Sequence, residues 1–150
     1  MKNIAVGIDF TDAREPVLEA ATELALALGA KLHLIHVIAP EPTFMGYAAY
    51  TYPGIDERSE ELEKEKTEIQ TIVDRLRLEG VDAYGYMRPG ETVRTLLEFA
   101  EDRGAGMIMV GTHSRKLLSR ILMGSSAEGV VRHSKIPVVV VPIATGDEDA

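Results

Sequence analysis

Stretches rich in apolar residues alternate with stretches of helical period along the whole chain, and no other feature limits the possible fold as strongly. The apolar stretches lie at residues 3–8, 32–38, 81–87, 107–110 and 138–141. Between them, apolar residues recur every three or four positions at residues 17–28, 57–78, 93–100 and 126–132. Short apolar runs are typical of strands buried on both faces, and the longer period is typical of helices. The alternation predicts an α/β fold, a doubly wound parallel sheet of five strands with helices on both faces, because each right-handed crossover lays its helix over the sheet.

Local signals mark where the first helix begins and ends. Pro16 is compatible with a helix only near the first turn, where its missing N–H is not needed. Gly29 is suited to stop the helix, because glycine readily adopts the left-handed conformation with which many helices end. The first predicted helix therefore lies between the strand at residues 3–8 and the strand at residues 32–38.

The composition is that of one soluble domain spanning residues 1–150. The chain is 45% apolar and 27% charged, and its length suffices to bury a core without disulfides or metals. It has no cysteine, which excludes a thiolate zinc site and a thiol nucleophile. Asp9 interrupts the N-terminal apolar run, which is too short for a signal peptide, and no run reaches membrane-spanning length. We expect a cytoplasmic protein without membrane insertion.

The charge balance bears on possible partners. The formal net charge is −8, and an acidic tail, expected to be flexible, occupies about residues 144–150. This charge repels nucleic acid and anionic lipid, so neither is an expected partner. A nucleotide remains a possible ligand, because a local group of amides and cations outweighs a distant field that is screened over about 10 Å.

The loop GTHSRKLLSRILMGSS, residues 111–126, follows the fourth predicted strand and is the principal candidate for a binding site. In open α/β sheets, ligands bind beyond the carboxyl ends of the strands. Gly111 allows close approach to the backbone, and Ser125 and Glu128 have the spacing of a capping box at a helix N-terminus, which suits a phosphate. Cations are available from Arg115, Lys116 and Arg120. The alternative is that such a loop needs glycines and a cap for structural reasons alone.

Asp9, at the end of the first strand, has two interpretations as well. Its carboxylate could hold a ribose or a metal-bound phosphate, or it could cap the following helix. The chain has no G-x-x-x-x-G-K-[ST] loop, no G-x-G-x-x-G after the first strand and no G-x-S-x-G elbow. His33 and His36, three apart on a strand, are expected to point to opposite faces, so no metal site is predicted.

The quoted segments resemble the universal stress protein (UspA-type) family over essentially the whole chain. The similarity lies in IAVGIDFTD, LHLIHVI and VGTHSRKLLSRILMGSSAEGVVRHSKIPVVVVP. The ATP-binding branch of that family has the pattern G-x2-G-x9-G-[ST], which Gly111, Gly124 and Ser125 match. Ser114 stands where the pattern has its second glycine.

The resemblance implies an adenine nucleotide alpha hydrolase-like sheet of strand order 3-2-1-4-5 and a site for ATP with Mg²⁺. It places Asp9 and Val37 beside the adenosine, with Val37 near the adenine ring, and has Met109 or Val110 lead into the phosphate loop. Thr11 matches a position that is usually serine in the family. The residues expected to bind nucleotide are Asp9, Thr11, Val37, Met109, Gly111, Thr112, Ser114, Arg115, Gly124, Ser125 and Ser126.

Ser114 leaves two interpretations of the loop open. If this position needs a positive φ, serine costs about 1 kcal/mol of strain. Its hydroxyl, however, is able to bond a phosphate oxygen. ATP binding is the favoured interpretation, and a dimeric scaffold of the same fold that binds no nucleotide is the alternative.

The family resemblance also implies a regulatory role. Its members are generally nucleotide-binding regulators made under stress, and some sense ATP, or ATP and AMP, for a partner such as a membrane transporter. We therefore expect a stress or energy-state regulator and no enzyme, because the sequence offers no placed general base. Slow ATP hydrolysis, with Asp9 and Asp12 as magnesium contacts, is the other alternative.

The final strand predicts a homodimer. Its residues, Val138, Val139, Val140 and Val141, form a strongly apolar run between Pro137 and Pro142. An exposed edge of this kind invites aggregation unless it is paired. Pairing two copies about a two-fold axis would bury the valines, and the dimers of the family resemble this arrangement.

Overall fold

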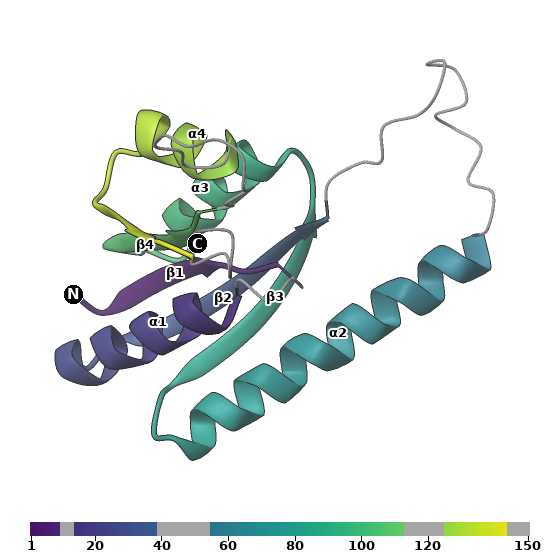
Figure 1. Ribbon diagram of the computed structural model, residues 1–150, viewed down its shortest axis with the longest axis horizontal. Helices are drawn as coiled ribbons and strands as arrows, with labels where there is room; N and C mark the ends of the chain where they lie inside the picture. The colour runs from purple at the N-terminus through teal and green to yellow at the C-terminus, as the bar shows by residue number, and fades with distance from the viewer. Residues whose placement is uncertain (10–13, 39–54, 113–124, 144–150) are drawn as a thin grey trace, which may run out of the picture.

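A computed structural model of the 150-residue chain describes residues 1–9, 14–38, 55–112 and 125–143. Its five strands form one parallel sheet of order β3-β2-β1-β4-β5, which confirms the predicted order 3-2-1-4-5 (Figure 1). The strands are β1 (Asn3–Gly7), β2 (Lys31–Ile38), β3 (Ala83–Pro89), β4 (Met107–Gly111) and β5 (Val138–Val141). The chain order reverses at β1, which pairs with β2 on one side and with β4 on the other.

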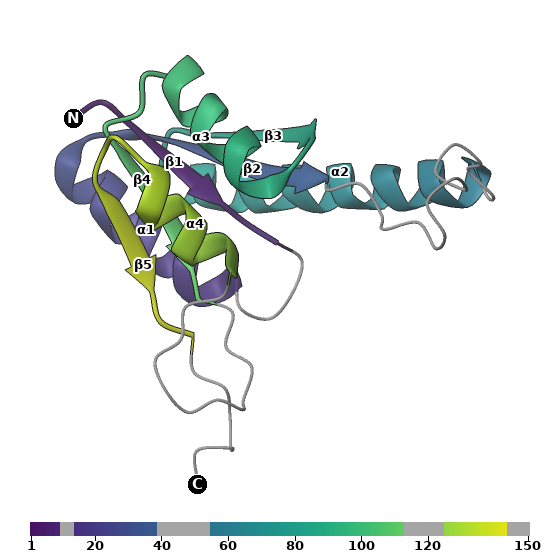
Figure 2. The ribbon, with the colours of Figure 1, turned by 90° about the horizontal axis from the view of Figure 1, so that it is seen from above.

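Helices cover both faces of the sheet, as predicted (Figure 1). On one face lie α1 (Arg14–Leu28) and α2 (Ile55–Leu78), and on the other lie α3 (Thr92–Asp102) and α4 (Ser125–His133). Helix α1 begins two residues before Pro16 and is followed by Gly29 at a φ of 66°, so both predicted boundary signals are confirmed. The N-terminal half of α2 extends beyond the sheet (Figure 2).

Two hydrophobic clusters form the core, one on each face of the sheet. Neighbouring residues of β1 belong to different clusters: Ile4 and Val6 pack under α1 and α2, whereas Ala5 packs under α3 and α4. All three are fully buried. Successive side chains of a strand point to opposite faces, so a strand covered on both sides needs a continuous apolar run. This is why the short apolar stretches of the sequence identify the strands.

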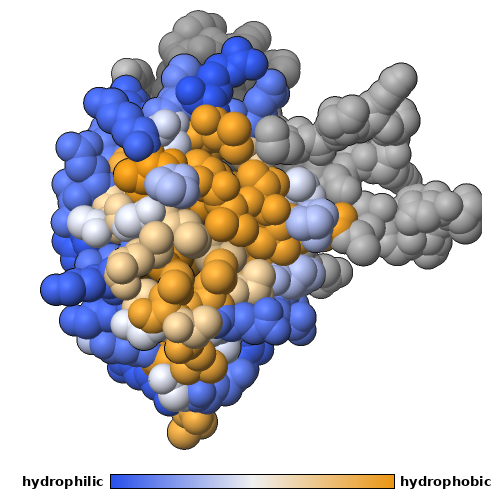
Figure 3. Space-filling model, turned by 90° about the vertical axis from the view of Figure 1, so that its left-hand side faces the viewer, coloured by the Kyte–Doolittle hydropathy of each residue, from blue (hydrophilic) through white to orange (hydrophobic). Residues whose placement is uncertain are grey.

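Strand β5 lies at the edge of the sheet and pairs with β4. Its four valines are each only partly buried, whereas the central residues of β4 are buried. Figure 3 shows apolar side chains gathered on the side of the molecule that carries this edge, and Val131 of α4 is 44% exposed. The predicted apolar edge therefore exists. The acidic segment 144–150 lies outside the described residues.

Candidate functional site

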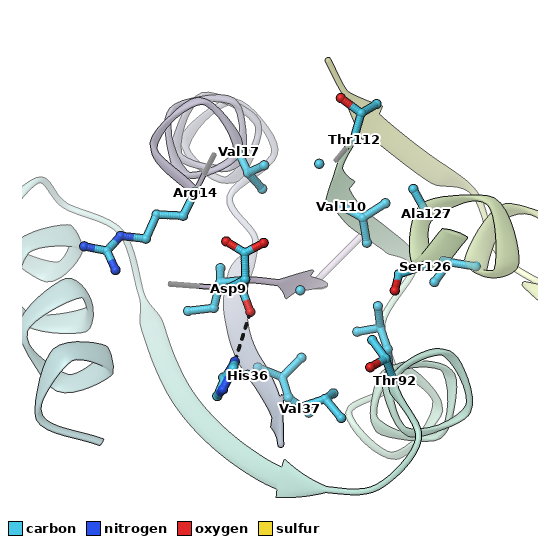
Figure 4. Close-up of a pocket in the computed structure, with 16 residues that line it drawn as sticks. Asp9, Arg14, Val17, His36, Val37, Thr92, Val110, Thr112, Ser126 and Ala127 are labelled. Carbon is cyan, nitrogen blue, oxygen red and sulfur yellow. Dashed lines mark hydrogen bonds between the residues drawn. The ribbon is translucent and has the colours of Figure 1, made fainter. Parts of the chain in front are cut away.

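A pocket opens beyond the carboxyl ends of β1, β2 and β4, where the strand order reverses (Figure 4). Open α/β sheets bind their ligands at this position. Helices contribute the remaining walls: α1 on one side of the pocket, and α3 and α4 on the other. The residues that line it are Gly7, Ile8, Asp9, Arg14, Val17, Ile35, His36, Val37, Thr92, Leu96, Val110, Gly111, Thr112, Ser126, Ala127 and Val130.

The fold brings together five of the residues expected to bind nucleotide, although they come from distant parts of the chain. These residues are Asp9, Val37, Gly111, Thr112 and Ser126. Figure 4 shows Asp9 between the α1 side of the pocket, with Arg14 and Val17, and the side that carries Ser126 and Thr92. The carboxyl ends of neighbouring parallel strands meet at one edge of the sheet, so this convergence follows from the strand order.

Met109 does not reach the pocket. Its side chain is fully buried in the cluster under α1 and α2, whereas its neighbour Val110 lines the pocket. The two residues face opposite sides of β4, because side chains alternate along a strand. Of the two residues expected to lead into the loop, Val110 is therefore the one at the site, and Met109 has a packing role.

Several expected residues cannot be placed relative to this pocket. Thr11, Ser114, Arg115 and Gly124 lie outside the described residues. Helix α4 begins at Ser125, and two residues of its first turn, Ser126 and Ala127, line the pocket. The N–H groups of a first helical turn lack partners within the helix and carry the positive end of its dipole, which favours an anion.

The predicted capping box involves a residue that has another partner. The carboxylate of Glu128 accepts a hydrogen bond from Nη2 of Arg132, one turn further along α4, at 3.1 Å. Opposite charges at this spacing stabilise a helix surface by a few tenths of a kcal/mol. Glu128 is thus engaged on the outside of α4.

Gly111 and Thr112 have structural roles in addition to their position at the pocket. A Cβ atom at Gly111 would lie 2.8 Å from Cγ2 of Val17 and 3.2 Å from Cδ1 of Ile143, closer than side chains normally pack. The Thr112 hydroxyl accepts a hydrogen bond from the Ile143 N–H at 2.9 Å. Both residues therefore hold the chain beyond β5 against the end of β4.

Two hydroxyl groups of the pocket make no hydrogen bond to any part of the chain that the structure describes. They belong to Thr92, the first residue of α3, and Ser126, in the first turn of α4. Both residues are partly buried. A hydroxyl group donates one hydrogen bond and accepts up to two. The hydroxyls of Thr92 and Ser126 are therefore available to hydrogen-bond a polar ligand in the pocket.

Sequence reasoning missed two basic residues of the pocket, Arg14 and His36. Nη1 of Arg14 lies 2.9 Å from Oε2 of Glu68 in α2. Nδ1 of His36 lies 3.4 Å from the Ile8 carbonyl, the dashed contact in Figure 4, and its Nε2 lies 3.5 Å from Oε1 of Glu65. The available signal was position alone: Arg14 follows the end of β1, and His36 lies near the carboxyl end of the neighbouring strand β2.

His33 does not line this pocket: it contacts Tyr86 on the α3 and α4 face of the sheet, whereas His36 contacts Glu65 of α2, which confirms that the two histidines of β2 point to opposite faces. Its Nε2 atom lies 2.8 Å from Oδ1 of Asn3, and its ring stacks on Tyr84 at 5.6 Å between centroids. Burial, aided by the charges of Arg103 and Lys31, lowers the pKa of His33 below its ordinary value. A neutral ring that donates from Nε2 to Asn3 fits these contacts.

Comparison with known proteins assigns the family. A model of the universal stress protein family matches residues 1–142. The chain is 33% identical over 142 residues to Universal stress protein MJ0531 of Methanocaldococcus jannaschii, covering 93% of this chain and 81% of the relative. The chain therefore belongs to the universal stress protein family, and the resemblance inferred from its motifs is confirmed.

Solved structures agree with the fold. The hypothetical protein MJ0577 superposes with a TM-score of 0.77 at 25% identity, over 97% of this chain and 98% of that one. The universal stress protein from Archaeoglobus fulgidus, solved in complex with dAMP, superposes with a TM-score of 0.68 at 23% identity, over 94% and 98% of the two chains. Among the helices of the described residues, none has the length and apolar composition to span a membrane.

Proposed function

We propose that the pocket binds an adenine nucleotide, with ATP carrying Mg²⁺ as its principal ligand. The observation that supports this most directly is the position of the pocket, at the reversal of strand order and against the first turn of α4. The dAMP complex of the Archaeoglobus fulgidus protein adds support, because that protein has the same fold. Five of the residues expected to bind nucleotide line this pocket.

The chemistry of the walls divides the pocket between the parts of such a ligand. Ile35, Val37 and Leu96 offer an apolar surface that suits a purine ring. The carboxylate of Asp9 would accept hydrogen bonds from ribose hydroxyls. The first turn of α4, with the Ser126 hydroxyl, would bind phosphate oxygens, and Mg²⁺ would enter with the phosphates of ATP.

The protein as purified provides the first test. Denaturing it and separating the released small molecules by chromatography should recover an adenine nucleotide. The emptied protein should then bind ATP, ADP or AMP with Mg²⁺ in calorimetric titrations. No recovered nucleotide and no heat of binding would contradict the proposal and favour the non-binding scaffold.

A variant at Ser126 tests the placement of the phosphates. Ser126→Ala should weaken ATP binding about threefold to tenfold, the loss expected for one hydrogen bond to a charged group. The matched control is Thr71→Ala, which removes a hydroxyl on the exposed side of α2 that bonds the Thr67 carbonyl. Equal affinities of both variants for ATP would show that the phosphates lie elsewhere.

We further propose that the protein acts as a homodimeric stress or energy-state regulator with little or no catalysis. In this role, a partner protein such as a membrane transporter would respond to nucleotide binding in the pocket. A phosphate-release assay separates this role from slow ATP hydrolysis. Steady release that Asp9→Ala abolishes would establish the hydrolytic alternative.

A further inference from the structure

Arg14 is the one lysine or arginine among the described residues that line the pocket. Its guanidinium, however, extends away from the pocket towards α2 (Figure 4). There Nη1 lies 2.9 Å from Oε2 of Glu68, and Nε lies 3.7 Å from Oε2 of Glu15. The permanent positive charge of this wall is therefore held by carboxylates outside the pocket.

The partner carboxylate is the more exposed member of the pair. The Glu68 side chain is 43% exposed, whereas that of Arg14 is 23% exposed. Ion pairs with a solvent-exposed partner contribute little net stability, since water compensates much of the attraction. Arginine has a long, flexible stem, and its planar guanidinium binds phosphate with two parallel hydrogen bonds. A phosphate that reaches Arg14 would therefore replace a weak contact to Glu68 with a stronger one.

A second contact joins the same two parts of the molecule. Glu65, three residues before Glu68 on α2, lies 3.5 Å from Nε2 of His36, which also lines the pocket. Residues three apart lie on the same face of a helix. Glu65 and Glu68, on one face of α2, thus contact two basic side chains of the pocket wall. Of these two, Arg14 is the one whose side chain is always charged.

We propose that Arg14 recognises the negative charge of the bound ligand by binding its phosphates. Glu68 competes with these phosphates for the Arg14 guanidinium. This inference rests on the proposed nucleotide site and names the residue that sets its preference for phosphorylated ligands. In the structure, Arg14 is paired with Glu68. In the complex, Arg14 binds phosphate and Glu68 loses its ion pair with Arg14. Ligand binding in the pocket therefore changes a contact of α2.

A double-mutant cycle on the full chain tests the competition. Arg14→Gln should weaken AMP and ATP binding about tenfold, by loss of a charge-assisted hydrogen bond. Glu68→Gln should strengthen binding of the same ligands about twofold to fivefold, because it removes the carboxylate that competes with phosphate for Arg14. The double variant should bind like Arg14→Gln alone, since Glu68 acts through Arg14. Arg14→Lys, which keeps the charge, should recover part of the affinity.

Controls separate this mechanism from general electrostatics. Glu19→Gln removes an exposed carboxylate from α1 and should leave the affinities unchanged. Adenosine, which has no phosphate, should bind the wild type and Arg14→Gln equally. If Glu68→Gln strengthens binding equally with and without Arg14, the effect is simple repulsion and the competition is overturned.

The same titrations distinguish failure of the inference from failure of the proposed function. Equal affinity of wild type and Arg14→Gln for ATP would overturn the role of Arg14 and leave the nucleotide site standing. A wild type that binds neither adenosine nor ATP would overturn both. Thermal unfolding of each variant without ligand verifies that the compared proteins are folded.

Discussion

At the scale of single residues, His33 links the core to pH. Burial lowers its pKa from the ordinary value of 6.5, so the folded protein holds the ring neutral at a pH where the unfolded chain begins to bind a proton. The stabilisation is complete above pH 6.5 and is lost as the pH falls from there towards the lowered pKa. The free energy of unfolding should therefore decrease on acidification, by at most about 1.4 kcal/mol per pH unit for one group.

Urea unfolding between pH 7.5 and pH 5 measures this effect at conditions of roughly constant ionic strength. His33→Gln should flatten the decrease in that interval, because glutamine keeps a donor for Asn3 and does not titrate. His133→Gln, at the end of α4, is the matched control and should leave the slope as it is in the wild type. The same slope in wild type and His33→Gln would show that other groups cause the pH dependence.

At the scale of the element, Glu91 determines where α3 begins. Its carboxylate accepts hydrogen bonds from the N–H groups of Val93 at 3.1 Å and Arg94 at 2.8 Å. These bonds lower the pKa of Glu91, so the cap is present at neutral pH and is lost as the pH falls through the lowered value. Glu91→Ala should destabilise the protein by about 0.5–1 kcal/mol at pH 7.

Urea unfolding at pH 7 tests the cap against a carboxylate of the same helix. Glu98→Ala removes an exposed acid from the middle of α3 and should change the free energy of unfolding much less. Thr92 and Leu96, on the two turns after Glu91, line the pocket, so Glu91→Ala should also weaken nucleotide binding. Equal stability of the Glu91 and Glu98 variants would show that the cap contributes nothing.

The difference between what the sequence predicts and what it misses is also clearest at this scale. Strands and helices could be predicted because their pattern lies in neighbouring residues. Asp9 and Ser126 could be placed at the pocket because open α/β sheets bind ligands where the strand order reverses. Arg14 meets Glu68 across 54 residues of sequence, and no local pattern encodes such a pair. The Glu91 cap was missed because Ser, Thr, Asp and Asn are the usual capping residues.

At the scale of the whole molecule, the outer edge of β5 is the feature that bears on assembly, because β5 pairs with β4 alone among the described residues. Its four partly buried valines would present an apolar strand with free backbone groups to solvent, which proteins normally avoid. Two chains that pair through β5 about a two-fold axis would satisfy those groups and cover the valines on both faces of the sheet. The wild type should therefore sediment as a dimer at micromolar concentration.

Charges introduced on either face of this edge should separate the dimer. Val139 packs towards α1 and Val140 towards α3 and α4, so Val139→Lys and Val140→Lys probe the two faces independently. Each should shift the sedimentation equilibrium towards monomer by at least about tenfold, because a lysine facing its symmetry mate must be desolvated or repelled. Leu78→Lys, at a residue 90% exposed at the end of α2, is the matched control and should remain dimeric.

Circular dichroism verifies that the monomers are folded. A wild type that is monomeric, or lysine variants that stay dimeric, would place any assembly of this protein on another surface and leave β5 protected by its short length alone.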